Sequence, residues 1–394
     1  MHEATEWQEY IPKQLNGTDM IESSTFFACL KRHDITFFVG VPDSLLKNFC
    51  FYISDHAEKG RHVITANEGN AVALAAGHYL ASGKPALVYM QNSGLGNAVN
   101  PLVSLLDPEI YGIPALLLIG WRGEPGTQDE PQHNKQGKIT PALLTTLGIP
   151  HVVLSKGSAA NLENILEKAC RYMENESAPY ALLVTNDCFA PYASGKKRIS
   201  PYQLSREEAI QEVIARLGSK DIVVTTTGKI SREFFEYRDV VNQGHEKDFL
   251  TVGSMGHASS IALGIALEKP SATVYCLDGD GAALMHMGAM GVLGAGPSNI
   301  IHIVINNGAH ESVGGQPTAA PNIDFISIAK ACGYKTARSV ETKESLRSQL
   351  RLISAKAGPS FLEVRVYPSS RKDLGRPTTR PLENKNAFMD FLKE

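Results

Sequence analysis

The segment DGDG at residues 278–281 combines acids and glycines where a phosphate and a metal ion could bind. It follows the apolar run VYCL and precedes a helical pattern. Glycines let the backbone approach a ligand, and the free amides at a helix start favour an anion such as a diphosphate. A carboxylate there would repel that anion unless a cation lay between them, and Mg²⁺ commonly binds protein and phosphate oxygens together. Asp280 is therefore a candidate metal ligand.

A second group of oxygen donors follows one helix and one strand later. The apolar run IIHIVI ends in Asn306, Asn307, Gly308 and Ala309. Because open parallel sheets bind ligands at the carboxyl ends of their strands, adjacent strands would bring the Asn307 side chain and a carbonyl near Ala309 close to Asp280. Each segment alone is an ordinary turn at least as often as a binding site. Their combination at this spacing predicts a metal site.

Glu68 stands in TANEGNAVALAAG, residues 65–77, where an apolar run meets a helical pattern of small residues. An acid at a helix start is commonly an exposed group that interacts with the helix dipole. The apolar residues on both sides instead favour burial, which raises the pKa of a carboxylic acid. A buried Glu68 would therefore keep its proton to a higher pH than an exposed glutamate.

The elements that must position these residues alternate along the chain. Continuous apolar runs separated by amphipathic stretches indicate parallel strands covered by helices on both faces of a sheet. Strands are expected at 35–42, 62–66, 85–90, 114–120, 151–155, 180–185, 221–228, 249–254, 272–281, 299–308 and 359–367. One helix is expected over 282–296. The predicted fold class is α/β, with two tandem domains of similar design, each a parallel sheet flanked by helices.

The segment 188–202 is rich in Pro, Gly, Ser and positive charge, which is typical of a linker. It predicts a first domain over 1–195 and a second domain over 196–394. The segment 121–138 is expected to be a loop that closes over the site as a lid, since long loops are often functional and closure excludes water. The segment 369–380 is expected to be an exposed, basic, irregular tail.

The composition narrows the class of partner. The chain has 394 residues, of which 43% are hydrophobic, and a net charge of -3, so it offers no general basic surface for nucleic acid or an acidic membrane. Its scattered cysteines lack the spacing of a metal site or disulfide framework and favour a reducing cytoplasm. The N-terminal MHEATEWQEY does not resemble a secretion signal, and no apolar run approaches the roughly 18 residues of a membrane span. We therefore expect a cytoplasmic protein that acts on small molecules, with no nucleic-acid or membrane partner.

Together these segments resemble the thiamine diphosphate-dependent decarboxylases, whose signature is GDG followed, after one helix and one strand, by a double asparagine. The resemblance implies a pyrimidine-binding first domain, a diphosphate-binding second domain, and thiamine diphosphate with Mg²⁺ as cofactors. It assigns Asp280, Asn307 and the backbone carbonyl of Ala309 to Mg²⁺. Further cofactor contacts are implied at Thr227, Gly228, Lys229, Gly253, Ser254, Met255, Gly279, Gly281 and Ala282. Met255 would be an apolar wedge under the bent cofactor.

The resemblance also implies catalytic roles for Glu68 and Asp43. Glu68 would bind the cofactor by exchanging a proton with N1′ of its aminopyrimidine ring. Asp43, in VGVPDS, would transfer a proton or assist product release, although it could instead cap the following helix. In this family the first domain of one subunit faces the second domain of its partner. That arrangement implies a homo-oligomer of at least two chains, with active sites between subunits.

An anionic 2-keto acid substrate calls for cationic or N–H donors. The residues that could supply such contacts are Ser44, Asn92, Ser93, Gly94, Arg122, His133, Lys138, Lys229, Arg232 and His257. The histidines His78, His286 and His302 fall within helix or strand patterns and are expected to be structural.

Most members of the family carry a third domain between the other two, and this chain leads directly from one to the other. It is most similar to the phosphonopyruvate decarboxylases, with sulfopyruvate decarboxylases as the nearest chemical alternative. The implied reaction converts 3-phosphonopyruvate to phosphonoacetaldehyde and CO₂, a step toward 2-aminoethylphosphonate and related phosphonates. A carboligase similar to acetolactate synthase is disfavoured by the missing middle domain. A nucleotide-binding regulatory protein is disfavoured because neither GLGNAV nor GAGPSN completes GxGxxG.

Overall fold

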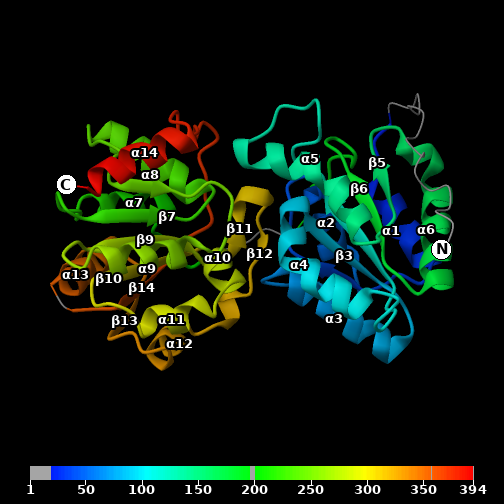
Figure 1. Ribbon diagram of the computed structural model, residues 1–394, viewed down its shortest axis with the longest axis horizontal. Helices are drawn as coiled ribbons and strands as arrows, with labels where there is room; N and C mark the ends of the chain where they lie inside the picture. The colour runs from blue at the N-terminus through cyan, green and yellow to red at the C-terminus, as the bar shows by residue number, and fades with distance from the viewer. Residues whose placement is uncertain (1–18, 196–199, 356, 394) are drawn as a thin grey trace.

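The computed structural model describes residues 19–195, 200–355 and 357–393, and its two α/β halves lie side by side (Figure 1). Each half contains one parallel six-stranded sheet with helices on both faces. This arrangement confirms the predicted fold class. It also places the carboxyl ends of the strands, where ligands bind in such sheets, at one edge of each half.

The first sheet has the strand order β2-β1-β3-β4-β6-β5. Its strands are β1 (Phe38–Gly40), β2 (His62–Ile64), β3 (Ala86–Gln91), β4 (Ala115–Gly120), β5 (His151–Leu154) and β6 (Tyr180–Val184). The helices of this half are α1 (Ser23–Arg32), α2 (Lys47–His56), α3 (Glu68–Ser82), α4 (Leu95–Pro101), α5 (Pro131–Thr146) and α6 (Leu162–Glu176). One face packs on α1, α2 and α6, and the other on α3, α4 and α5. Burial from both sides explains why β3 and β4 are continuous apolar runs.

The second sheet has the order β13-β14-β10-β9-β7-β8. Its strands are β7 (Ile222–Thr225), β8 (Asp248–Leu250), β9 (Val274–Gly279), β10 (Ile300–Asn306), β13 (Thr336–Val340) and β14 (Ser360–Arg365). The helices are α7 (Arg206–Ile214), α8 (Lys229–Val240), α9 (Ala258–Glu268), α10 (Asp280–Met285), α11 (Ala289–Gly294), α12 (Phe325–Ala331), α13 (Lys343–Ser354) and α14 (Pro381–Phe391). One face packs on α7, α8 and α13, and the other on α9, α11, α12 and α14. The strands predicted for both halves are confirmed, and β13 is an addition.

Two local predictions are wrong in part. The expected lid over 121–138 is irregular only as far as Glu130, because α5 begins at Pro131, a residue suited to the first position of a helix. The helix expected over 282–296 is divided into α10 and α11, which are separated at His286–Gly288. The segment 369–380 contains no helix or strand, as expected.

The connection between the halves runs from the end of β6 at Val184 to the start of α7 at Arg206. The predicted domain boundary between residues 195 and 196 falls in this connection, where residues 196–199 lie outside the described part of the chain. The boundary therefore stays a prediction. Among the described helices, none has the length and apolar character that crossing a membrane requires.

The two halves meet at the edges formed by the carboxyl ends of their strands. Figure 1 shows α10 and the short antiparallel pair β11 (Ala309–His310) and β12 (Gln316–Pro317) beside α4 and α5. The side-chain amide of Asn67 lies 3.5 Å from the carbonyl oxygen of Met285, and Arg232 lies 3.4 Å from Glu130. These contacts show that segments after the strands of the first sheet face segments after the strands of the second sheet.

Candidate active site

Glu68 is the first residue of α3, and only 5% of it is exposed, which confirms the predicted burial. Burial raises the pKa of its carboxyl above 4.5, although a hydrogen bond from Asn97 opposes part of that rise. The amide Nδ2 of Asn97 lies 2.8 Å from Oε2 of Glu68. Glu68 is therefore a buried acid that can hold a proton at a higher pH than an exposed glutamate.

Gly94 makes room for this carboxyl group. A Cβ atom at position 94 would lie 2.5 Å from Oε1 of Glu68, closer than side-chain atoms approach one another. The sequence predicted that Gly94 contacts the substrate. The structure instead places Gly94 against Glu68, so a glycine is needed here for a steric reason.

Asp43 follows β1 and is completely buried. Its oxygens accept hydrogen bonds from the backbone N–H of Leu45, at 2.9 Å, and from the side-chain amide of Gln91, at 2.6 Å. The helix cap considered for Asp43 is wrong, because α2 begins at Lys47 with Leu46 at its cap position. Asp43 is thus a fixed, buried acid at the same sheet edge as Glu68.

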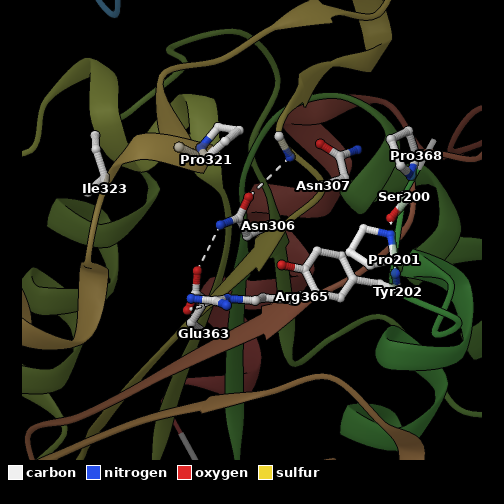
Figure 2. A pocket seen from close by; sticks show the side chains of 12 residues that line it. Ser200, Pro201, Tyr202, Asn306, Asn307, Pro321, Ile323, Glu363, Arg365 and Pro368 are labelled. Carbon is white, nitrogen blue, oxygen red and sulfur yellow. Dashed lines mark hydrogen bonds and ion pairs between the residues drawn. The ribbon is translucent and has the colours of Figure 1, made fainter. Parts of the chain in front are cut away.

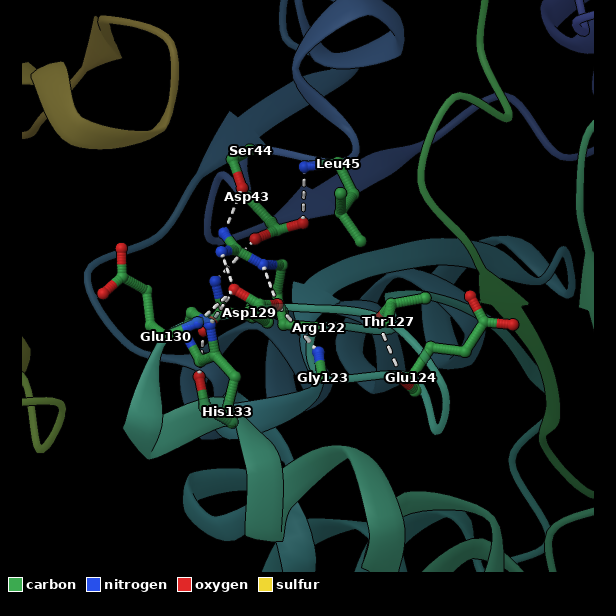
Figure 3. A network of polar contacts seen from close by, with 12 residues as sticks. Asp43, Ser44, Leu45, Arg122, Gly123, Glu124, Thr127, Asp129, Glu130 and His133 are labelled. Atoms are coloured by element: carbon green, nitrogen blue, oxygen red, sulfur yellow. Dashed lines mark hydrogen bonds and ion pairs between the residues drawn. The ribbon is translucent and has the colours of Figure 1, made fainter.

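Arg122 lies beside Asp43 in a polar network centred on Asp129 (Figure 3). Asp129 accepts hydrogen bonds from Nε of Arg122 and the backbone N–H of Gly123, both at 2.8 Å, and contacts Nδ1 of His133 at 2.9 Å. Burial alone would raise the pKa of Asp129, but the Arg122 and His133 hydrogen bonds hold it well below its usual range. Another guanidinium nitrogen of Arg122 donates to Ser44 Oγ at 2.7 Å. An ionised Asp129 therefore holds Arg122 and His133, two of the predicted substrate-binding donors, in place.

Asn92 is buried and uses its side chain within the first half. Its Nδ2 donates to the Arg122 carbonyl at 2.9 Å and to Thr140 Oγ1 at 3.0 Å, and its Oδ1 accepts from the Arg122 N–H at 3.2 Å. These partners already occupy the side chain of Asn92, and its predicted contact with the substrate stays a prediction. Its neighbour Ser93 is exposed and donates to Oε1 of Gln91 at 2.7 Å.

Asp280 begins α10 and is 3% exposed. Burial raises the pKa of Asp280 to about 6, although hydrogen bonds from Thr318 and from the Asn307 backbone N–H favour the charged form. The Asn307 contact confirms that the ends of β9 and β10 bring these two residues together. A buried carboxyl group in such a place would be stabilised in its charged form by a cation.

Asn307 is oriented by its neighbours. Its Oδ1 accepts from the Ala309 N–H at 3.0 Å, and its Nδ2 donates to Glu311 at 2.9 Å. Glu311 in turn forms an ion pair with the buried Arg206, which also contacts Glu233 through Nε at 2.7 Å. The sequence did not predict these linked ion pairs, which hold Glu311 in place and so orient the Asn307 amide.

The side chain of Asn306 bonds to residues other than Asp280. It lines a pocket of about 400 Å³ that also includes Tyr202, Glu363 and Arg365 (Figure 2). Its Nδ2 donates to Glu363 at 2.7 Å, and its Oδ1 accepts from the Gly308 N–H at 3.1 Å. Asn307 lines the same pocket and is the asparagine whose backbone N–H bonds to Asp280.

The turn expected under the cofactor, residues 253–256, follows β8 and is hydrogen-bonded to the segment that follows β7. The Gly253 N–H donates to Thr227 Oγ1 at 3.0 Å. Gly228 and Gly253 have φ angles of 102° and 74°, which glycine adopts without strain, and Ser254 shares this conformation at 47°. Met255 is half-buried in the same turn.

The remaining predicted cofactor residues lie close by in the second half. Lys229 is the half-buried first residue of α8, and burial lowers the pKa of its ammonium group. Gly279 precedes α10, and Gly281 and Ala282 lie in its first turn. His257 is exposed next to Met255, and its ring centroid lies 4.3 Å from that of His286.

Three charged side chains meet where the halves touch. Glu130, at the end of the irregular segment, pairs with Arg232 of α8 at 3.4 Å and with Arg376 of the C-terminal tail. The sequence singled out Arg232 but missed Glu130 and Arg376, because they lie far from it along the chain. Lys138 is exposed on α5.

Asn97 and Met285 join the two parts of the site. Nδ2 of Asn97, which binds Glu68, lies 3.9 Å from the sulfur of Met285, the last residue of the helix that Asp280 begins. The sequence predicts a site shared between subunits. In this single chain, however, the edges that carry Glu68 and Asp280 face each other. The arrangement places a buried carboxyl group with a raised pKa on each side, Glu68 in the first half and Asp280 in the second.

Comparison with known proteins gives two family matches. The N-terminal TPP binding domain of thiamine pyrophosphate enzymes matches residues 23–143, and the C-terminal TPP binding domain matches residues 226–364. A phosphonopyruvate decarboxylase of Streptomyces hygroscopicus is 34% identical over 392 residues, which cover 95% of each chain. One from Streptomyces viridochromogenes is 34% identical over 391 residues, with the same coverage. A sulfopyruvate decarboxylase of Methanosarcina acetivorans is 31% identical over 389 residues, covering 92% of this chain and 95% of the relative.

Proposed function

The chain belongs to the family of thiamine pyrophosphate enzymes, and from that premise we propose that it decarboxylates 3-phosphonopyruvate to phosphonoacetaldehyde and CO₂. The two Streptomyces relatives, matched over nearly their whole length, support this substrate. Sulfopyruvate is the second candidate, because the relative from Methanosarcina acetivorans is named for it and is matched over a similar length. Both substrates are 2-keto acids that carry a second anionic group.

The observation that carries the proposal is the position of the two acids. Glu68 and Asp280 are both buried and both have a raised pKa. The helices that they begin meet at the contact between the halves, where Asn67, the cap residue of α3, lies 3.5 Å from Met285, the last residue of α10. Perturbed carboxyl groups at the carboxyl ends of parallel strands are typical of a catalytic site. Asn97 links the two sides through its contacts with Glu68 and Met285.

The residues present fit thiamine diphosphate with Mg²⁺. We propose that Asp280, the side-chain oxygen of Asn307 and the carbonyl of Ala309 hold the ion, because Mg²⁺ prefers oxygen ligands. The raised pKa of Asp280 supports this assignment, since a cation there would relieve the cost of burying its charge. Thr227 and Lys229, at the start of α8, would contact the diphosphate.

Thiamine diphosphate supplies, when bound, an electron sink for the bond to the departing carboxylate. Glu68 would hold a proton and share it with ring nitrogen N1′, and its buried position keeps that proton from water. Asp43, equally buried at the same sheet edge, would move a proton to or from the product. Met255, in the turn after β8, would support the cofactor from below.

We propose that the substrate's anionic groups bind where cations gather at the contact between the halves. Arg122 is held beside Ser44 by Asp129, and Arg232 with Arg376 surrounds the single carboxylate of Glu130. A dianionic phosphonate could replace Glu130 between these two guanidinium groups. Arg376→Met should then raise KM for phosphonopyruvate more than KM for pyruvate, whereas equal effects on both would exclude this role.

We also propose a homo-oligomer of at least two chains, acting in the cytoplasm. Each of the six cysteines, all within the described residues, is a free thiol, which fits a reducing compartment. Light scattering after size-exclusion chromatography would measure the number of chains, and a monomer at all concentrations would contradict the proposal.

A coupled aldehyde assay with equal concentrations of phosphonopyruvate, sulfopyruvate and pyruvate tests the function. We expect the highest kcat/KM for phosphonopyruvate, with turnover dependent on added thiamine diphosphate and Mg²⁺. Preference for sulfopyruvate would favour the second candidate. Formation of a condensed acid from pyruvate instead of an aldehyde would indicate a carboligase.

A further inference from the structure

Three side chains of types that bind metals converge inside the second half, on the core side of strands β9 and β10. Cys276 and Asp278 lie on the same face of β9, and His302 is paired in register with Cys276 from β10. All three are at most 1% exposed. The Cys276 sulfur, one Asp278 oxygen and one His302 ring nitrogen lie within 4.8 Å of one another.

Two of these atoms have no hydrogen-bond partner among the described residues: Oδ2 of Asp278 and Nε2 of His302. They lie 3.5 Å apart, which is long for a hydrogen bond between a charged oxygen and nitrogen. Two ligands of a tetrahedral zinc ion, each about 2.0 Å from the metal, are separated by about 3.3 Å. The observed distance is thus close to that expected for ligands of one ion.

The contact of the other ring nitrogen of His302 is also compatible with a metal ion at Nε2. Nδ1 lies 3.1 Å from the hydroxyl of Tyr334. When Nδ1 donates its proton to that oxygen, Nε2 presents a lone pair toward the Asp278 carboxylate. In that tautomer Nε2 and the carboxylate are both acceptors, and a cation between them would satisfy both. A metal-bound histidine is commonly held by such a hydrogen bond to its second nitrogen.

We propose that Cys276, Asp278 and His302 bind one Zn²⁺ ion that joins β9 to β10. A thiolate and a carboxylate neutralise a divalent ion, so the cluster as a whole carries no net charge in the core. Sulfur and imidazole ligands favour Zn²⁺ over Mg²⁺, which prefers oxygen. A water molecule would complete the tetrahedron. Because β9 ends at Gly279, directly before Asp280, the ion would stiffen the strand that carries the cofactor-binding turn.

The test is the zinc content of the full-length protein, purified with Zn²⁺ in the growth medium and washed with a chelator to remove surface metal. We expect one zinc per chain in the wild type and in Cys50→Ser, a control that alters a cysteine equally buried outside the cluster. Cys276→Ser and His302→Gln should lose the zinc. Asp280→Asn should keep it, which separates this ion from one at the cofactor site.

Cobalt substitution provides a second measurement that does not depend on whether the variants fold. Wild-type protein grown with Co²⁺ should show a sulfur-to-cobalt charge-transfer band in the near ultraviolet and visible bands of tetrahedral cobalt. The alternative is a proton shared by Asp278 and His302, in which case the wild type binds neither zinc nor cobalt. That result, or zinc retained in Cys276→Ser, would overturn the proposal.

Discussion

The side-chain amide of Asn97 donates a 2.8 Å hydrogen bond to Oε2 of Glu68 and lies 3.9 Å from the sulfur of Met285 in the other half. One side chain thus contacts both the buried acid and the helix that begins with Asp280. The hydrogen bond lowers the pKa of Glu68 while burial raises it, so Asn97 limits how basic the acid becomes. Asn97 therefore links the buried Glu68 of the first half to helix α10 of the second half.

Glu68→Gln should stabilise the cofactor-free protein at neutral pH. Burial raises the folded-state pKa of Glu68 above its unfolded value of 4.5, so ionising this group as the pH rises destabilises the folded state. Glutamine keeps an acceptor for Asn97 without the charge. The gain should be about 1.4 kcal/mol for each unit of pKa difference, and it should vanish as the pH falls below the unfolded value. Urea unfolding at pH 4 and pH 7.5 checks this, and a gain independent of pH would contradict it.

Gly94→Ala should displace Glu68, since the new Cβ would lie 2.5 Å from Oε1. We expect kcat to fall on the order of 100-fold, within the range that general acid–base groups contribute. Gly96→Ala is the matched control, because Gly96 lies two residues further on, in α4, and a Cβ there meets nothing within 4 Å. Steady-state kinetics of both variants check the prediction, which fails if their kcat values are alike.

Asp280→Asn should weaken thiamine diphosphate binding and its dependence on Mg²⁺. The substitution removes the charge that would face the ion, and we expect an increase in Kd on the order of 100-fold. Asp324→Asn serves as a control, because Asp324 caps α12 in the same half and asparagine caps a helix equally well. Calorimetric titration with and without Mg²⁺ measures the effect. Unchanged affinity in Asp280→Asn would remove the metal site.

Mixing Glu68→Gln with Asp280→Asn distinguishes a shared site from one within a single chain. If sites form between subunits, chains exchanged between the two inactive variants restore about a quarter of the wild-type sites. If each site forms within one chain, as the facing edges of this chain suggest, activity stays at the level of the separate variants. The assay is turnover after denaturing and refolding the mixture, with each variant alone as the control.

The sequence predicted the sheets well because their strands are continuous apolar runs buried on both faces. It predicted the burial of Glu68 and the proximity of Asp280 to Asn307, because each of these residues stands shortly after such a run. It missed α5, since the helix begins with the polar stretch PQHNKQGK, and β13, whose sequence TARSV alternates polar and apolar residues.

The supporting residues could not be found from sequence in the same way. Asn97 reaches Glu68 from another helix, and Arg206 reaches Glu311 from a position 105 residues away. Asn92 shows the same limit, because its place after β3 suggested substrate binding, whereas the partners of its side chain lie in α5 and in the segment after β4. Such roles depend on which side chains the fold brings together, which local patterns do not encode.

Exchange of the cofactor's C2 proton for deuterium, followed by NMR after acid quench, tests the central claim most directly. In the wild-type holoenzyme this exchange should be fast, because Glu68 is proposed to assist the deprotonation by sharing a proton with the aminopyrimidine. In Glu68→Gln the cofactor should remain bound while exchange slows by about 100-fold or more. Exchange at the wild-type rate in a fully loaded Glu68→Gln enzyme would contradict the account.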